Sequence, residues 1–584
     1  MIGKQMENIT RREFTKQMAA FGAAALSVKT LAASIDSPKQ KNARPNIILI
    51  MTDDSGYSDL GCYGGEIDTP SIDRLGRGGI RFANFYTAAR CSPTRASLLT
   101  GCDSARAGFA AGTLGGWNRE MKLPAYRARL PYQLPTLPEL LKTGGYNTMM
   151  AGKWHLGGSL MKDAPARQAL WKKQHPGWEL TPEEIDADFN ALPAQRGFNK
   201  FFGMAEGETH FFFTPQDSHE YLDGNMPVKL DYRTTYNMHC YYENEGHYPY
   251  TANHGKRAKA FYDTDGVTDK TIEMINEACK NPEHPFFIYL AYRAPHLPLQ
   301  APQELVDKYL PRYDDLAKVE TDRIDGLVRE KLLPENTIYR SSFQKGNMDA
   351  EKKTDFQRRL AIHAAMLEKV DENVQRVMDA LERNGQLENT LVLYLSDNGA
   401  AAHVGDMMNK PYRGCKALLW EGGTRTHLIA YWKDRIKPAI NDTFCDIRDI
   451  LPTCLTLAEV DYPKTFRGVK ADEPDGRDIS NAFKGEKLPP AEYIFLNDKG
   501  QQGCICKGKW KLLIEPGWYA ITSKEAGVKY ELYDLENDPT ETKDLSKQMP
   551  QIVQQLTEVC RKWQDKCGIV DYAEILKTRP DHTK

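Results

Sequence analysis

A cysteine stands at the predicted start of a helix, in the run Cys-Ser-Pro-Thr-Arg that begins at Cys91. Ser92 is expected to cap this helix, Pro93 suits its first position and Gly101 suits its end. The free amides and the dipole at a helix start attract anions, and Arg95 adds a permanent positive charge. Cys91 is therefore a candidate nucleophile facing an anionic group, with a buried structural cysteine as the ordinary alternative.

Polar side chains follow four apolar runs of the chain. These runs predict buried strands of a parallel sheet, and they are Asn46 to Met51, Tyr146 to Met150, Pro285 to Tyr292 and Thr390 to Ser396. The polar residues beyond them are Asp53, Asp54, Lys153, His155, His296, Asp397 and Asn398. Because the carboxyl ends of parallel strands share one edge of a sheet, these side chains are expected to converge on Cys91. Each alone fits an ordinary turn, but the coincidence at four strands favours a site.

A glycine-rich connection after the last of these runs carries one more candidate. It runs from Arg413 to Arg425 and leads into a strand predicted from Thr426 to Trp432. Lys416 lies within it and would by itself be an ordinary surface lysine. The long segment from about Leu160 to Asp265 lacks a regular pattern, so it fits either the wall of a pocket or an irregular packed insertion.

Helix signals separate the predicted strands. Thr136 and Glu139 form a capping box for a helix that ends at Gly144, and apolar residues at steps of three and four from Leu360 to Leu381 predict another. Near the C-terminus we expect two antiparallel strands and a final helix, at Trp510 to Ile514, Lys529 to Leu535 and Ile552 to Cys567. The expected fold is α/β, with a large mixed, mostly parallel central sheet, helices on both of its faces and a small C-terminal α+β subdomain with an antiparallel sheet.

The length and charge of the chain limit its function. It has 584 residues, and 77 Lys plus Arg against 79 Asp plus Glu give a formal net charge of −2, which does not favour nucleic-acid binding. We divide the chain into an export signal at 1–33, a linker at 34–44, a catalytic domain at 45–488 and the C-terminal subdomain at 489–584.

The first residues have the features of an export signal. Arg11 and Arg12 precede a mild apolar run from Met18 to Val28 and small residues at Ala32 and Ala33. This pattern resembles a twin-arginine signal, with a plain amphipathic helix as the alternative, and the apolar run is too short to span a membrane. We therefore expect export of the folded chain to the periplasm by the twin-arginine machinery. The 12 cysteines could form bridges there, but their spacing fixes no pairing.

The run from Cys91 to Gly101 resembles the signature of the sulfatase family, a branch of the alkaline phosphatase superfamily. Cys91, Pro93 and Arg95 fall on its Cys-x-Pro-x-Arg core, and Leu-Thr-Gly at 99–101 falls on the usual extension. The likeness runs from Pro45 to about Leu545 and is closest to the bacterial arylsulfatases. It implies that a maturation enzyme oxidises Cys91 to Cα-formylglycine.

The resemblance also implies roles for the residues at the strand ends. The residues that would hold one Ca²⁺, with Mg²⁺ as the alternative, are Asp53, Asp54, Cys91, Asp397 and Asn398. Hard oxygen ligands suit either ion, and Asn398 stands where zinc phosphatases of the superfamily usually carry histidine. The residues that would match the family's catalytic and sulfate-binding set are Cys91, Arg95, Lys153, His155, His296 and Lys416.

The resulting hypothesis is a sulfuric ester hydrolase that releases sulfate from an aryl or carbohydrate ester. One hydroxyl of the hydrated aldehyde would attack sulfur while Arg95 holds the diol and Lys153 contacts sulfate. His155 would deprotonate the second hydroxyl to expel sulfate, and His296 and Lys416 would protonate or stabilise the leaving alkoxide or phenoxide. The alternatives are a phosphodiesterase or phosphonate monoester hydrolase of the superfamily and a catalytically silent binding protein on this fold.

Overall fold

The computed structural model describes residues 44–110, 123–157, 190–205, 211–213, 241–243, 246–247, 261–343, 349–489, 492–496, 503–515 and 529–569. The predicted export signal and all of the linker except Arg44 lie outside these residues. So does most of the irregular segment between Leu160 and Asp265.

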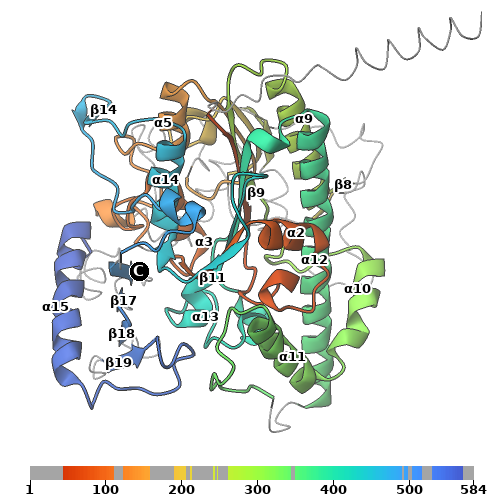
Figure 1. Cartoon of the computed structure of the whole chain (residues 1–584), viewed down its shortest axis with the longest axis vertical. Coiled ribbons are helices and arrows are strands. Elements are labelled where there is room, and N and C mark those ends of the chain that lie inside the picture. Colours follow the sequence, from red (N-terminus) through yellow and green to blue (C-terminus); the bar gives the residue numbers. More distant parts are fainter. Residues whose placement is uncertain are drawn as a thin grey trace, which may run out of the picture. The chain divides into compact units, whose positions relative to one another are not determined.

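A central sheet of eleven strands organises the described part of the chain (Figure 1). Across the sheet, the order is β12 (Ala439–Asn441), β2 (Ile80–Tyr86), β11 (Arg425–Tyr431), β10 (Thr390–Ser396), β1 (Asn46–Thr52), β9 (Phe286–Ala291), β3 (Asn147–Lys153), β4 (Lys200–Met204), β6 (Tyr241–Glu243) and β7 (Gly246–His247), with β13 (Cys445–Asp446) beside β2. Strands β10, β1, β9, β3 and β4 are parallel, whereas β11 is antiparallel to β10 and β2. The predicted mixed, mostly parallel sheet is confirmed.

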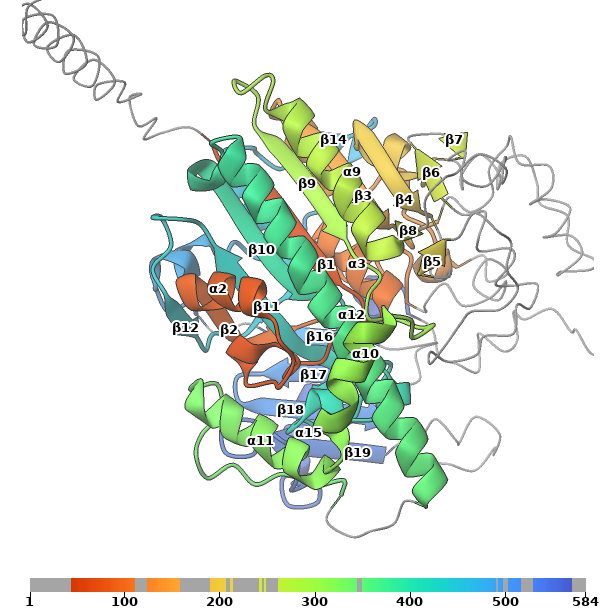
Figure 2. The same cartoon turned by 90° about the vertical axis from the view of Figure 1, so that its right-hand side faces the viewer.

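Helices cover both faces of this sheet. They are α2 (Pro70–Gly78), α3 (Cys91–Thr100), α5 (Leu137–Thr143), α9 (Asp263–Ala278), α10 (Gln303–Tyr309), α11 (Leu316–Arg329), α12 (Ala350–Arg383), α13 (Glu421–Thr424) and α14 (Ile450–Leu457). Alternate residues of β1 point to opposite cores. Ile48 and Ile50 pack with α9 and α12, the face seen in Figure 2, whereas Leu49 and Met51 pack with α3, α5 and α14. Burial on both faces explains why β1 is apolar from Ile47 to Met51.

The four central strands end at one edge of the sheet. Thr52 at the end of β1 is paired in register with Ser396 at the end of β10. On the other side Met51 pairs with Ala291, which pairs in turn with Gly152 of β3. Strand β3 extends past Met150, the predicted end, to Lys153, because its last residues pair with β4.

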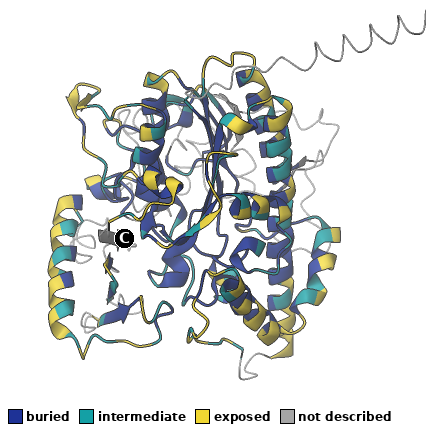
Figure 3. Ribbon diagram, in the orientation of Figure 1, coloured by how far each residue is buried: buried dark blue, intermediate teal, exposed yellow. Residues whose placement is uncertain are grey.

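The C-terminal region forms a second, antiparallel sheet. Its order is β16 (Glu492–Leu496), β17 (Gly503–Lys507), β18 (Trp510–Glu515) and β19 (Lys529–Asp534), and helix α15 (Pro550–Cys567) packs on it. Two small two-stranded sheets pair β5 (Phe212–Phe213) with β8 (Phe261–Tyr262) and β14 (Thr465–Phe466) with β15 (Val469–Lys470). In Figure 3 the central strands are buried and the outer face of α15 is exposed.

Two further findings concern the described residues only. None of their helices is both long enough and apolar enough to cross a membrane. Their eleven cysteines are all free thiols, among them Cys504 and Cys506 on β17, and Cys560 and Cys567 on α15.

Candidate active site

Cys91 is the first residue of α3. The N-cap is Arg90, whose backbone is extended, and no side chain caps the helix, so the prediction that Ser92 does so is wrong. Pro93 is consequently the third helical residue and not the first. The helix ends as expected at Gly101, which has φ +67° and donates its amide to the carbonyl of Ser97 over 2.8 Å.

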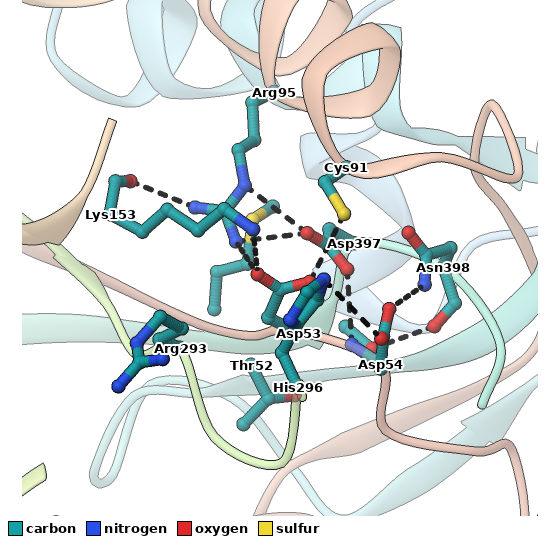
Figure 4. A network of polar contacts seen from close by, with 12 residues as sticks. Thr52, Asp53, Asp54, Cys91, Arg95, Lys153, Arg293, His296, Asp397 and Asn398 are labelled. Carbon is teal, nitrogen blue, oxygen red and sulfur yellow. Dashed lines mark hydrogen bonds and ion pairs between the residues drawn. The ribbon is translucent and has the colours of Figure 1, made fainter. Parts of the chain in front are cut away.

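The side chain of Cys91 faces the end of β1 (Figure 4). Its thiol donates to Oδ1 of Asp53 over 3.2 Å. The other carboxylate oxygen of Asp53, Oδ2, accepts a hydrogen bond from the ammonium group of Lys153. Nη2 of Arg95 lies 3.4 Å from the same oxygen. All three of these charged side chains are fully buried. The thiol therefore lies beside one anion that two buried cations compensate.

The guanidinium group of Arg95 contacts residues from three neighbouring parts of the sheet. Its Nε and Nη2 donate to Oδ2 of Asp397 over 3.1 and 2.9 Å, and its Nη1 donates to the carbonyl of Lys153 over 2.9 Å. Nη1 also donates to the hydroxyl of Tyr289 on β9 over 3.2 Å. Sequence reasoning missed Tyr289, although a tyrosine within a buried apolar strand is a signal, because its hydroxyl needs a partner.

Asp54 lies beside three further predicted residues, Lys416, Asn398 and His296. Its φ is +72°, which turns the chain sharply after β1. Nζ of Lys416 lies 2.6 Å from its Oδ1, and the side-chain amide of Asn398 donates to the same oxygen over 2.7 Å. Nε2 of His296 is 3.8 Å from its Oδ2. Lys416, which comes from the glycine-rich connection after β10, thus joins the residues of the strand ends.

Burial and neighbouring charges shift the pKa values of the carboxyl groups in opposite directions. Burial opposes ionisation of Asp53, but Lys153, His296 and Arg95 outweigh it and hold its pKa well below the usual value. Burial, together with the charges of Asp53 and Asp54, raises the pKa of Asp397 to about 7. Three carboxyl groups packed this closely favour a bound cation.

The basic residues of the site are shifted as well. Burial, and then the charges of Lys153 and Arg95, lower the pKa of His155 well below its usual value. Burial opposes the charge of Lys416, but Asp54 reverses this and raises its pKa well above normal. His155 is therefore a neutral imidazole at pH 7, whereas Lys416 stays an ammonium group. Burial and the charge of Lys416 lower the pKa of His296.

The residues present fit a hard divalent cation. Single ligand atoms of Asp53, Asp54, Cys91 and His296 all lie within 4.8 Å of one another. Oδ1 of Asn398, beside them, is buried and has no hydrogen-bond partner in the described structure. Carboxylate and amide oxygens are the ligands that calcium and magnesium prefer. His296, predicted as a catalytic residue, lies in this cluster too.

The sequence matches one family of known proteins. A family model described as Sulfatase matches residues 45–460. The chain is 30% identical over 587 aligned residues to an uncharacterized sulfatase of Schizosaccharomyces pombe, covering 91% of this chain and 95% of that protein. It is 30% identical to an arylsulfatase of Klebsiella aerogenes over 61% of this chain and 66% of that enzyme. The crystal structure of Ps i-CgsB is similar with a TM-score of 0.62 and 25% identity, over 89% and 93% of the two chains.

Proposed function

The chain belongs to the sulfatase family and hydrolyses sulfate esters, and from this premise we propose that it does so through Cys91, oxidised to Cα-formylglycine, beside one Ca²⁺. The observation that carries the proposal is the meeting of Asp53, Asp54, Asp397 and Asn398 with Cys91 at one edge of the sheet. Mg²⁺ remains the alternative ion, because the same oxygen ligands suit it.

The metal would be held by Asp53, Asp54, Asp397, Asn398 and the modified Cys91. When bound it would neutralise charge on the sulfate oxygens, and the hydrated aldehyde would supply the oxygen nucleophile and a second hydroxyl for release of sulfate. The protein contributes a buried, preorganised set of cations around that point. Arg95, paired with Asp397, would hold the nucleophile, and Lys153, which reaches the same oxygen of Asp53 as Arg95, would bind a sulfate oxygen.

Proton transfer falls to the imidazole and ammonium groups. His155 is neutral because burial and two cations lower its pKa, so its ring accepts the proton that must leave the second hydroxyl. Lys416 keeps its proton beside Asp54 and stabilises the leaving oxygen, with His296 beside it. In this proposal His155 is the base on the side of the nucleophile, and Lys416 is the acid on the side of the leaving group.

The substrate is proposed to be an aryl or carbohydrate sulfate. Named relatives include arylsulfatases, which supports the aryl class. We also propose that a formylglycine-generating enzyme matures Cys91 and that the twin-arginine machinery exports the folded chain to the periplasm. The motif at Arg11 and Arg12 supports the export route.

Two measurements test the proposal. Mass spectrometry of the peptide containing Cys91, from protein produced with a maturation enzyme, should show the loss of sulfur that accompanies conversion of the thiol to an aldehyde. Assays of the same protein with aryl sulfates, defined sulfated saccharides and phosphate esters should give the largest kcat/KM for a sulfate ester. Cys91→Ala should be inactive. An unmodified Cys91 with full activity, or preference for phosphate or phosphonate esters, would contradict the proposal.

A further inference from the structure

A lysine of the C-terminal sheet is buried where that sheet meets the catalytic domain. Lys511 lies on β18, is fully buried, and pairs with two carboxylates from different parts of the chain. Its Nζ is 2.7 Å from Oε1 of Glu421 and 2.8 Å from Oε1 of Glu541. Burial opposes its charge, but both carboxylates outweigh that effect and raise its pKa well above normal. An ion pair this deep is costly to form, so a specific role is expected.

Glu421 is held from several sides. Its backbone amide donates to Oε2 of Glu541 over 2.9 Å, and the hydroxyl of Tyr86 donates to its own Oε2 over 2.9 Å. Nη1 of Arg425 donates to the same oxygen over 3.3 Å. Glu421 begins α13, so these contacts fix the position of the two glycines that follow it.

These two glycines contact the loop that carries the proposed metal ligand Asn398. The amide of Gly399 donates to the carbonyl of Gly423 over 3.2 Å. The backbones are so close that a Cβ on Gly399 would lie 1.9 Å from the carbonyl oxygen of Gly422. A shift of Glu421 would therefore be transmitted to Gly399 and to Asn398 beside it.

The same turn holds the connection that carries Lys416. The amide of Gly422 donates to the carbonyl of Arg413 over 2.8 Å, and a Cβ on Gly423 would lie 1.9 Å from the carbonyl oxygen of Leu418. The amide of Lys416 donates to the carbonyl of Ala400 over 3.0 Å, which joins the two loops to each other. The loop that carries Asn398 and the loop that carries Lys416 thus both depend on the turn formed by α13.

We propose that Lys511 is a positioning residue of the active site, acting through Glu421 and the glycine turn to place Asn398 and Lys416. The C-terminal sheet is then a working part of the catalytic centre, because its buried lysine helps to fix the turn that holds both loops. This inference rests on the proposed metal site and on the role proposed for Lys416. Residues that orient metal ligands affect metal affinity or activity by roughly 10- to 100-fold.

The test compares two buried cations in the full-length protein. Lys511→Met removes the ammonium group and keeps an unbranched side chain that is shorter by one heavy atom. The control is Arg196→Met, because Arg196 is equally buried and pairs with Glu139 at 3.2 Å. Arg196 precedes the first residue of β4, whereas the active site lies where the parallel strands end. Thermal unfolding, Ca²⁺ binding by calorimetry to metal-stripped protein, and kcat and KM for an aryl sulfate are measured for each.

Both variants should unfold at lower temperature, but only Lys511→Met should lose Ca²⁺ affinity and kcat, each by roughly 10- to 100-fold. A folded Lys511→Met protein with the affinity and kcat of the wild type would overturn the inference. Should Lys511→Met not fold, Glu541→Gln replaces it, with weaker Ca²⁺ binding expected and unchanged binding overturning the inference. Wild-type Ca²⁺ binding and turnover test the proposed function separately, so the two failures are distinguishable.

Discussion

Asn398 donates its side-chain amide to Oδ1 of Asp54 over 2.7 Å, across 344 positions of sequence. The two residues follow β10 and β1, whose last residues, Ser396 and Thr52, are paired in register. The other amide atom of Asn398, Oδ1, is buried without a hydrogen-bond partner in the described structure. A buried acceptor of this kind is costly unless something binds it, so it is well placed to be a ligand of a hard cation.

Asn398→Ala should weaken the binding of Ca²⁺, because it removes this oxygen while the carboxylates stay. We expect at least a ~10-fold rise in the Ca²⁺ concentration that restores half of the activity after treatment with a chelator. Asn398→Asp keeps an oxygen donor and serves as the control. The same half-restoring concentration for Asn398→Ala and wild type would show that this side chain does not bind the ion.

Lys416→Met should slow the reaction most for esters of poor leaving groups. The ammonium group, held by Asp54 at 2.6 Å, stabilises a leaving alkoxide that cannot carry its charge alone. The expected loss of kcat/KM is about 10²–10³-fold for an alkyl or saccharide sulfate and much less for a nitrophenyl sulfate. A series of aryl sulfates of increasing phenol pKa measures this dependence.

The matched control for that series is Lys410→Met. Lys410 is also buried and pairs with Glu320 at 3.1 Å, but it lies outside the active-site contacts described above. This variant should keep the wild-type dependence on the leaving group even if it is less stable. An equal loss on every ester in Lys416→Met would argue for a role of Lys416 in binding sulfate and against the leaving-group role.

The strand ends could be predicted because a strand that is buried on both faces is a continuous run of apolar residues in the sequence. The run from Thr390 to Ser396 is apolar where β10 is covered by helices on each side, and it becomes polar where the strand leaves the core. Parallel pairing then requires Asp53 and Asp397 to lie at one edge. The gathering of acidic residues at one edge of the sheet therefore followed from the pattern of the strands.

Other positions depend on close backbone contacts that no periodicity encodes. Lys416 reaches Asp54 only because the loops on either side of Gly399 and Gly423 pack backbone to backbone. The start of α3 was predicted wrongly because the extended backbone of Arg90 takes the capping position that a serine usually fills. The buried pairing of Lys511 with carboxylates distant in sequence was not foreseen either.

Gly152→Ala should disturb the active site through the backbone of β3. Gly152 has φ +108°, and a Cβ there would lie 2.0 Å from the carbonyl oxygen of Ala291 on β9. The end of β3 must move to relieve this overlap, and Lys153 moves with it. We expect a loss of about 1–3 kcal/mol in unfolding free energy and a fall in kcat on the order of 10²-fold.

Gly145→Ala is the control for backbone strain alone. Gly145 also has a positive φ, +82°, but a Cβ there would have no atom within 4 Å. Denaturant unfolding and steady-state kinetics of the two variants separate the effect of a strained positive φ from the effect of displacing the end of β3. Retained kcat in a destabilised Gly152→Ala protein would mean that the position of Lys153 tolerates the shift.

His427 should make the fold sensitive to acid. It is fully buried on β11, and its ring stacks on Tyr394 with centroids 5.5 Å apart and planes at 19°. Burial lowers its pKa from 6.5 to about 4. The folded protein therefore binds fewer protons than the unfolded chain between these pH values. The contribution of His427 to the free energy of unfolding is consequently complete above about pH 6.5, and it is lost as the pH falls towards 4.

His427→Phe keeps an aromatic ring of similar size and removes the titration. The difference in unfolding free energy between variant and wild type should shift in favour of the variant by on the order of 3 kcal/mol between pH 7.5 and pH 4. Other acid-sensitive groups act on both proteins and cancel in this difference. Denaturant titrations at several pH values measure it, and a difference that does not change with pH would show that His427 is protonated as readily in the fold as in the unfolded chain.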